Sequence, residues 1–163
     1  MRLTEHSSRL ADAITRTVDS CAEVSPLTLD THGTTRLWLN LSPELVVLLV
    51  QPERDDREMY AEFFHCQGWR AIPVSAAHDA LRVAPLADVI ITGILLPGRM
   101  DGLEFVAQLK ADKRTQSIPV IVLTTCSWNG ERKRAENAGC AAFLSKPCLP
   151  ADLVGAVRRV LAR

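Results

Sequence analysis

Short apolar runs alternate with amphipathic segments along the chain from about residue 45 to its end. The apolar runs lie at 45–50, 69–74, 88–92, 119–124 and 141–144, and their length and lack of polar alternation predict strands covered on both faces. Apolar residues at three- and four-residue spacing predict helices at 53–67, 75–83, 103–111 and 131–137, and a last helix from Pro150 onwards.

Residues with strong conformational preferences mark the ends of these helices. Gly68 and Gly139 follow two of them at the position where glycine favours helix termination. Pro150 suits the first turn of the last helix, and Ser75 is expected to cap the short helix at 75–83. The side of the helix at 53–67 that faces the core is predicted to carry Met59, Phe63 and Phe64.

Five strands that alternate with five helices predict an α/β fold with a parallel sheet, right-handed crossovers and helices on both faces. Strand order 2-1-3-4-5 is one of two common solutions for such a sheet. In that order the carboxyl ends of strands one, three, four and five surround one mouth, where open α/β sheets bind ligands. The loop at 93–102, which follows the third strand, should therefore contribute to any functional site.

Residues 1–44 have a different pattern and are predicted to form an N-terminal extension to the domain at 45–163. Apolar positions at helical spacing predict an amphipathic helix at 4–22, and the polar segment at 25–35 predicts a loop. The segment at 36–41 alternates apolar and polar residues and predicts a half-buried strand or an extended arm. Its apolar side chains should be covered within the same chain or in a dimer.

Composition and charge exclude several classes of protein. The chain has 163 residues, with 19 Lys and Arg against 19 Asp and Glu, so no net positive charge favours nucleic acid or an anionic membrane. The basic run at 132–134 lies between Glu131 and Glu136 and is interpreted as a solvated helix face. No apolar stretch is long enough to span a membrane, and no signal peptide precedes the domain, which favours the cytoplasm. Five cysteines without a CxxC pair argue against a disulfide framework and a zinc site.

Several segments together resemble the receiver domain of bacterial two-component response regulators. They are the strand and helix rhythm at 45–162, the loop at 96–102, the strand at 119–124, and the segment at 138–147 that ends in Lys146-Pro147. The resemblance covers nearly three quarters of the chain. It implies a flavodoxin-like fold with strand order 2-1-3-4-5, that is, a three-layer αβα sandwich. It also implies a cis peptide bond before Pro147.

Receiver domains accept a phosphoryl group from a histidine kinase on an aspartate at the end of the third strand. By resemblance, Thr124 and Lys146 occupy the positions that bind the phosphoryl oxygens, and Phe143 occupies the position of the aromatic side chain that moves on activation. The nucleophile position falls on Gly93, which has no side chain. The acidic pair that helps to hold Mg²⁺ falls on Gln51 and Pro52.

These replacements predict a degenerate receiver, or pseudo-receiver, with no catalytic residue, no metal and no cofactor. Lys146 loses the carboxylates with which the family would pair it, and an unpaired semi-buried charge is costly. Three hypotheses follow: Glu53 compensates the charge, Lys146 and Thr124 hold an anion or water, or Lys146 extends to solvent.

The resulting functional prediction is a protein-interaction module in phosphorelay signalling that is not an enzyme and works without phosphorylation. Its expected partners are signalling proteins, such as a histidine kinase or another regulator, and neither nucleic acid nor membrane. The face at 129–162 is expected to dock a partner or form a homodimer, as is the N-terminal extension. Because the chain ends with the last receiver helix, output is expected through another protein.

Two alternative functions stay open. A conventional phosphoaccepting receiver could use a displaced acid, either Asp101 or Glu53, although Asp101 also suits a turn and Glu53 a helix N-terminus. A ligand or redox sensor could use the vacant pocket, because Cys126 lies two residues past Thr124 and Cys148 two past Lys146, at the same mouth. Trp128 lies in the same loop as Cys126, where it would make an exposed contact or cover the site. The other two cysteines of the domain, Cys66 and Cys140, are expected in or near the core.

Overall fold

The computed structural model describes residues 44–125 and 129–162. Within them a central sheet is formed by β1 (Val46–Val50), β2 (Arg70–Val74), β3 (Val89–Thr92), β4 (Val120–Thr124) and β5 (Ala142–Ser145). The helices are α2 (Arg54–Cys66), α3 (Ala77–Val83), α4 (Gly102–Ala111), α5 (Asn129–Asn137) and α6 (Pro150–Leu161), with a short 3-10 helix, η1 (Ala84–Leu86). The helix, loop and arm predicted within residues 1–43 lie outside the described residues.

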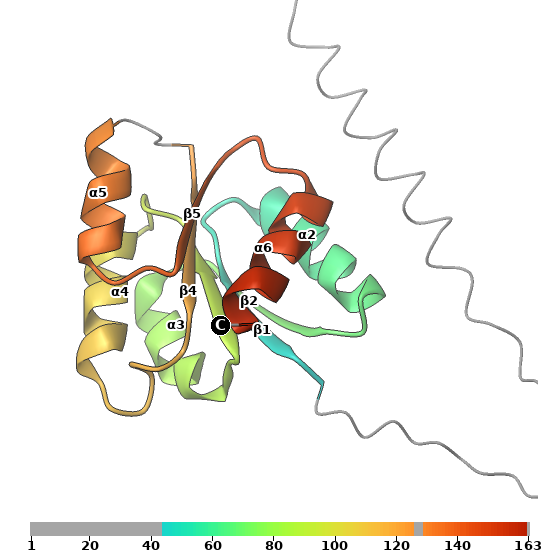
Figure 1. Ribbon diagram of the computed structural model, residues 1–163, viewed down its shortest axis with the longest axis horizontal. Coiled ribbons are helices and arrows are strands. Elements are labelled where there is room, and N and C mark those ends of the chain that lie inside the picture. Colours follow the sequence, from blue (N-terminus) through green and yellow to red (C-terminus); the bar gives the residue numbers. More distant parts are fainter. Residues whose placement is uncertain (1–43, 126–128, 163) are drawn as a thin grey trace, which may run out of the picture. The chain divides into compact units, whose positions relative to one another are not determined.

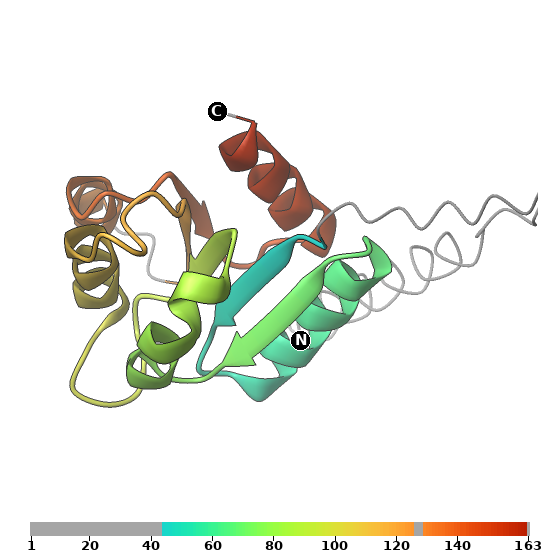
Figure 2. The same ribbon diagram turned by 90° about the horizontal axis from the view of Figure 1, so that it is seen from below.

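The five strands are parallel and follow the order β2-β1-β3-β4-β5, which confirms the predicted topology and the flavodoxin-like fold. Figure 1 shows α3, α4 and α5 on one side of the sheet and α2 and α6 on the other. The view in Figure 2 shows the same layers from below. The three-layer arrangement follows from strands that are apolar on both faces and must be covered twice.

Each face of the sheet has its own apolar core. Ile90, Val120 and Val122 pack with Phe105 and Leu109 on the side of α3 to α5. The opposite core packs strand residues against α2 and α6 through Val47, Leu49, Ile121, Tyr60, Phe64, Leu153 and Val157. Such an arrangement fixes the sheet rigidly, so the loops at its carboxyl edge start from defined positions.

Most predicted element boundaries differ from the observed ones by one or two residues, and two local expectations were wrong. Ser75 does not cap α3, because the N-cap residue is Ala76 and no side chain accepts a hydrogen bond there. Cys66 is exposed at the end of α2, whereas Cys140 is half-buried against the core as expected. The expectation failed for Cys66 because it is two residues from the buried Phe64, which places it about 200° around the helix, on the outer side of α2.

Gly68 and Gly139 adopt positive φ angles of 73° and 93°, as expected for glycines that end helices. Pro150 is the first residue of α6. In α2, Phe64 and Tyr60 are buried, while Met59 and Phe63 are half-buried against the core. Among the described residues, no helix is both long enough and apolar enough to cross a membrane.

Tyr60 joins α2 to the loop after β5, because its buried hydroxyl donates a 2.8 Å hydrogen bond to the carbonyl of Cys148. Burial raises the pKa of Tyr60 well above its ordinary value, with smaller contributions from Cys148 and Asp56. The folded state therefore retains the phenol proton more tightly than the unfolded state. The stabilisation should be complete below the ordinary pKa of about 10 and should be lost as the pH rises above it.

Tyr60 is the sole tyrosine of the sequence, so tyrosinate absorbance reports on it alone. We expect the folded protein to resist tyrosinate formation until it unfolds, and the urea-unfolded chain to titrate near the ordinary pKa. Tyr60→Phe should cost about 1 kcal/mol at neutral pH and weaken the alkaline loss of stability. Titration of the folded protein near pH 10 without unfolding would contradict this account.

Candidate functional site at the carboxyl edge of the sheet

Gly93 directly follows β3 and is buried at the point where the sheet meets its loops. Its amide donates a 3.0 Å hydrogen bond to the carbonyl of Val50, at the end of the neighbouring strand β1. Its φ angle is not positive, so the backbone does not require glycine here. A Cβ at this position would lie 3.4 Å from Gln51 Oε1, which means that Gln51 faces the space left by the missing side chain.

Gln51 follows β1 and is fully buried with both ends of its amide engaged. Its Nε2 donates to the carbonyl of Leu123 in β4 at 3.2 Å, and its Oε1 accepts from Lys146 Nζ at 2.8 Å. The side chain thus bridges the ends of three strands. The neutral amide can do this without the repulsion that a carboxylate would meet at the Leu123 carbonyl.

Lys146 follows β5 and points into the same site, with 13% of its side chain exposed. Its ammonium lies 2.5 Å from Asp56 Oδ2 and 3.6 Å from Glu53 Oε2. Lys146 therefore does not extend to solvent unpartnered, and that hypothesis was wrong. Glu53 does face the ammonium, as hypothesised, but Asp56 is closer and less exposed, with 32% of its side chain accessible against 60% for Glu53.

Asp56 was missed by the sequence analysis. It lies in the first turn of α2, where Asp55 and Asp56 both suit a helix N-terminus, so local pattern gives no reason to select one of them. Only the docking of α2 against the sheet points Asp56 toward Lys146. Asp55 remains exposed.

Arg57 holds the backbone of the loop between β1 and α2. Its Nη1 donates to the carbonyl of Gln51 at 2.6 Å and to the carbonyl of Pro52 at 2.8 Å. Two cationic side chains therefore organise this loop: Arg57 binds its backbone carbonyls, and Lys146 binds the side chains of Gln51, Asp56 and Glu53.

The other positions implied by the resemblance lie around this network. Thr124 is buried at the end of β4, and its carbonyl accepts a 2.8 Å hydrogen bond from the amide of Lys146. The peptide bond between Lys146 and Pro147 is cis, as the resemblance implied. Phe143 is buried, and the Arg132 guanidinium lies 5.0 Å from its ring centre.

The candidate acid Asp101 and the candidate thiol Cys148 take no part in the Lys146 network. Asp101 caps α4 by accepting hydrogen bonds at 2.8 Å from the amides of Leu103 and Glu104. Cys148 is buried, and burial raises the pKa of its thiol, with a smaller contribution from Asp152. Cys126 and Trp128 lie outside the described residues.

These residues do not fit the magnesium site that the resemblance implies. Mg²⁺ is usually held in proteins by carboxylate oxygens and water. Here Gln51 offers an amide, Pro52 and Gly93 offer no side-chain donor, and the carboxylates of Asp56 and Glu53 face an ammonium. Within residues 44–125 and 129–162, no group of three or more His, Cys, Asp or Glu side chains is placed to hold a metal.

The charge network predicts a ranked set of stability losses. Lys146→Met leaves the buried Gln51 Oε1 and Asp56 without their donor and should cost about 1–3 kcal/mol in urea unfolding. Asp56→Asn should cost about 1 kcal/mol, whereas Glu53→Gln, at the longer and more exposed contact, should cost less than about 0.5 kcal/mol. A larger loss for Glu53→Gln than for Asp56→Asn would show that Asp56 is not the principal partner.

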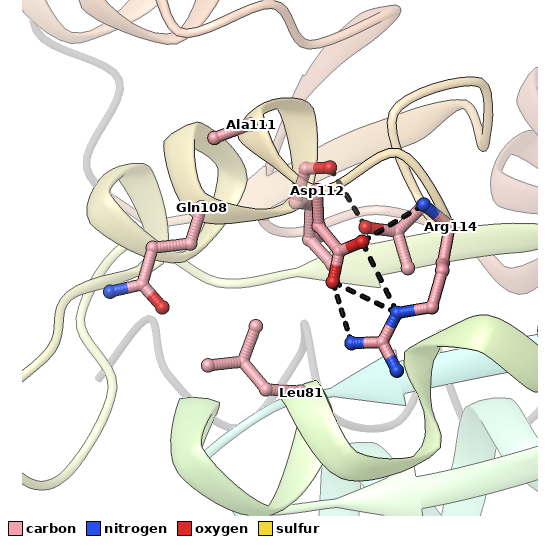
Figure 3. Close-up of a pocket in the computed structure, with 7 residues that line it drawn as sticks. Leu81, Gln108, Ala111, Asp112 and Arg114 are labelled. Atoms are coloured by element: carbon pink, nitrogen blue, oxygen red, sulfur yellow. Dashed lines mark hydrogen bonds and ion pairs between the residues drawn. The ribbon is translucent and has the colours of Figure 1, made fainter.

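A cavity of about 400 Å³ lies away from this site, between α3 and α4. In Figure 3, Gln108 and Ala111 from α4 and Leu81 from α3 surround it, beside the hydrogen-bonded pair of Asp112 and Arg114. The hydrogen bonds from Arg114 lower the pKa of Asp112 to about 2. No residue of the Lys146 network lines this cavity.

The sequence and the fold of this chain are similar to those of known response regulators. Response regulator Rre1 of Synechocystis sp. is 35% identical over 127 residues, which are 76% of this chain and 54% of Rre1. The chain therefore spans about half the length of this curated relative. The solved structure of chemotaxis response regulator CheY4 of Vibrio cholerae covers 72% of this chain and 98% of its own, with 27% identity and a TM-score of 0.66.

The receiver domain of sensor histidine kinase PA1611 from Pseudomonas aeruginosa, solved with a magnesium ion coordinated in its active site cleft, covers 74% of this chain and 99% of its own. Its TM-score of 0.67 at 24% identity shows a common fold. The family model "Response regulator receiver domain" matches residues 47–158, which are most of the described domain. This chain therefore belongs to the receiver domain family of response regulators.

Proposed function

We propose that this receiver domain does not accept a phosphoryl group and acts as a phosphorylation-independent protein-interaction module in two-component signalling. In this sense it is a pseudo-receiver. It performs no catalytic step, and its output passes through the proteins that it binds.

The Lys146 network is the observation that carries the proposal. At the nucleophile position Gly93 provides no oxygen to attack phosphorus, and the adjoining space faces Gln51 Oε1. The ammonium that would bind phosphoryl oxygens is engaged with Gln51 and Asp56. A phosphoryl group would therefore have neither an acceptor nor an available cation at this site.

The same contacts argue against a displaced acid as acceptor. Asp101 forms a reciprocal capping box with Glu104, whose Oε2 accepts from the Asp101 amide at 3.0 Å, so its carboxylate stabilises the start of α4. Glu53 lies on the exposed side of Lys146. Transfer to either acid would require the loss of a structural contact.

We propose further that the domain needs no Mg²⁺. The ammonium of Lys146 supplies positive charge among the side chains of the site, and Arg57 supplies it at the backbone carbonyls of the first loop. These two residues would perform the organising role that a divalent cation has in phosphorylated receivers. Equal thermal stability with Mg²⁺ and with EDTA would support this part.

The proposed partners are signalling proteins, such as a histidine kinase or another regulator, that dock on the face at 129–162. A homodimer through the same face is the second arrangement, and sedimentation velocity distinguishes the two by mass. A role in nucleic-acid binding is not proposed for this domain, since the sequence has equal numbers of acidic and basic residues.

The direct test is incubation of the full chain with acetyl phosphate and Mg²⁺, followed by intact mass measurement. We expect no labile phosphoryl adduct, and we expect beryllofluoride with Mg²⁺ to leave the amide spectrum unchanged. An adduct on any aspartate or glutamate would overturn the proposal. A disulfide that involves Cys148 after mild oxidation would favour the redox alternative instead.

A further inference from the structure

Among residues 44–125 and 129–162, β5 is the last strand of the sheet and pairs on one side only, with β4. A strand that pairs on one side leaves alternate backbone N–H and C=O groups directed away from the sheet. Figure 1 shows α5 and α6 flanking β5 on opposite faces of the sheet. This edge is therefore a place where another extended chain could add hydrogen bonds.

A groove of about 440 Å³ lies against this edge. Phe143, Leu144 and Ser145 of β5 contribute to its lining, together with Arg132 of α5 and several residues of α6. Ser145 is exposed and Leu144 is half-exposed, so part of β5 is in contact with solvent at the groove. Four strand residues at about 3.3 Å each give a length of about 13 Å, which suits an extended segment of about four residues.

The charges that line the groove are predominantly positive. Arg132 from α5 and Arg159 from α6 line it, and among the described residues of its lining the one carboxylate is that of Asp152. Within residues 44–125 and 129–162, neither arginine forms an ion pair within 4.0 Å. The Arg132 guanidinium is held over the Phe143 ring, and Arg159 Nη1 lies 3.6 Å from the position of a Cβ on Gly155. Arg132 is thus held over Phe143, and Arg159 lies beside Gly155 in the lining of the groove.

We propose that this groove binds an extended acidic segment of a partner protein, which adds to the edge of β5 as a further strand. The backbone of β5 would supply the hydrogen bonds, and Arg132 and Arg159 would select acidic side chains. The inference rests on the proposed function, since it names the mode and the chemistry of the partner contact for the interaction module.

A second copy of this chain is a poorer occupant of the groove. Pairing of two β5 edges across a two-fold axis would bring four arginines together with two aspartates. The excess positive charge at such an interface is unfavourable. An acidic partner segment compensates that charge instead.

The test uses the full chain and a fluorescent hexapeptide of alternating valine and glutamate with blocked ends. We expect saturable binding in a titration, and protection from hydrogen exchange at the β5 amides that face away from β4. The same peptide with N-methyl groups on alternate residues keeps its charge but cannot complete a strand ladder, and it should bind at least about tenfold more weakly.

Charge reversal tests the role of the two arginines. The pair Arg132→Glu with Arg159→Glu should weaken binding about tenfold. The matched control is Lys133→Glu with Arg82→Glu, which changes the net charge equally at exposed positions outside the groove and should have little effect. Circular dichroism and urea unfolding confirm that both variants are folded, and the N-methyl comparison on the unsubstituted protein needs no variant.

Three outcomes would overturn the inference: no binding at millimolar peptide, equal binding of the N-methyl peptide, or a dimer that the Arg132→Glu and Arg159→Glu pair abolishes. Repeating the titration after acetyl phosphate treatment separates the two proposals. Absent peptide binding without a phosphoryl adduct defeats the strand-addition inference alone. A phosphoryl adduct defeats the proposed function, whatever the peptide does.

Discussion

We expect a variant with Gln51→Asp, Pro52→Asp and Gly93→Asp to take up a phosphoryl group from acetyl phosphate in the presence of Mg²⁺, whereas the unsubstituted protein remains unlabelled. The change is from no detectable adduct to an adduct visible in the intact mass. EDTA should abolish it, because two carboxylates after β1 would then hold the cation.

The geometry of the site gives the physical reason. The backbone of Gly93 can accept an L side chain, and a carboxylate there would project toward the space now facing Gln51 Oε1. Replacing Gln51 with the shorter aspartate removes the 3.4 Å contact with the new side chain and releases Lys146 from its amide contact. The new carboxylate at position 93 could then attack phosphorus and expel acetate, with Lys146 and the cation beside the transferred group.

Gly93→Asp alone is the matched control. Its carboxylate would meet the ammonium of Lys146 and the crowded Gln51 side chain but no acidic pair, so we expect little or no label. Labelling of the single variant as efficiently as the triple variant would show that Gln51 and Pro52 are not what excludes the cation. Labelling of the unsubstituted chain would refute the proposed function itself.

The largest expected loss of stability comes from Gly102→Ala. Gly102 begins α4 and lies directly against the loop after β3: its amide donates a 2.7 Å hydrogen bond to the carbonyl of Ile94, and an added Cβ would lie 1.8 Å from the carbonyl oxygen of Gly93. The obstructing carbonyl belongs to the backbone of the buried residue Gly93, so it cannot rotate away as a side chain could. We expect a loss of about 3 kcal/mol or more, seen as a fall of about 10 °C or more in Tm.

Gly155→Ala serves as the control because Gly155 lies within α6, and its added Cβ would make an ordinary 3.6 Å contact with Arg159. Alanine favours a helix interior, so this variant should gain about 0.5–1 kcal/mol. Equal effects of the two substitutions would mean that the close approach of Gly102 to Gly93 does not limit stability.

The sequence predicted the type and order of the elements well because each carries its own local signal. Continuous apolar runs such as 119–124 identify covered strands, and Gly68 and Gly139 end helices at positive φ. Expectations that depended on a side chain reaching a particular group were less successful. Ser75 did not become a cap, and Cys66 is exposed on the outer side of α2.

At the site, the sequence alone shows that residue 93 has no side chain. It does not show which side chains contact Lys146. Asp56 and Gln51 are 90 and 95 residues distant from Lys146 in sequence. Residue type alone does not select Asp56 over its neighbour Asp55. The sequence also did not show that position 102 requires glycine. The Gly93 carbonyl that excludes a side chain there is brought close only by the path of the loop.

The sequence by itself determined which elements form, that they alternate, and that the residue directly after β3 is a glycine and not an acid, because these properties depend on residues close together along the chain. The tertiary structure decided that Lys146 contacts Asp56 and Gln51, and that β5 is the last strand of the sheet within the described residues, beside two arginines. Those properties depend on the parallel pairing that brings distant strand ends into contact, and no local pattern encodes which side chains then meet.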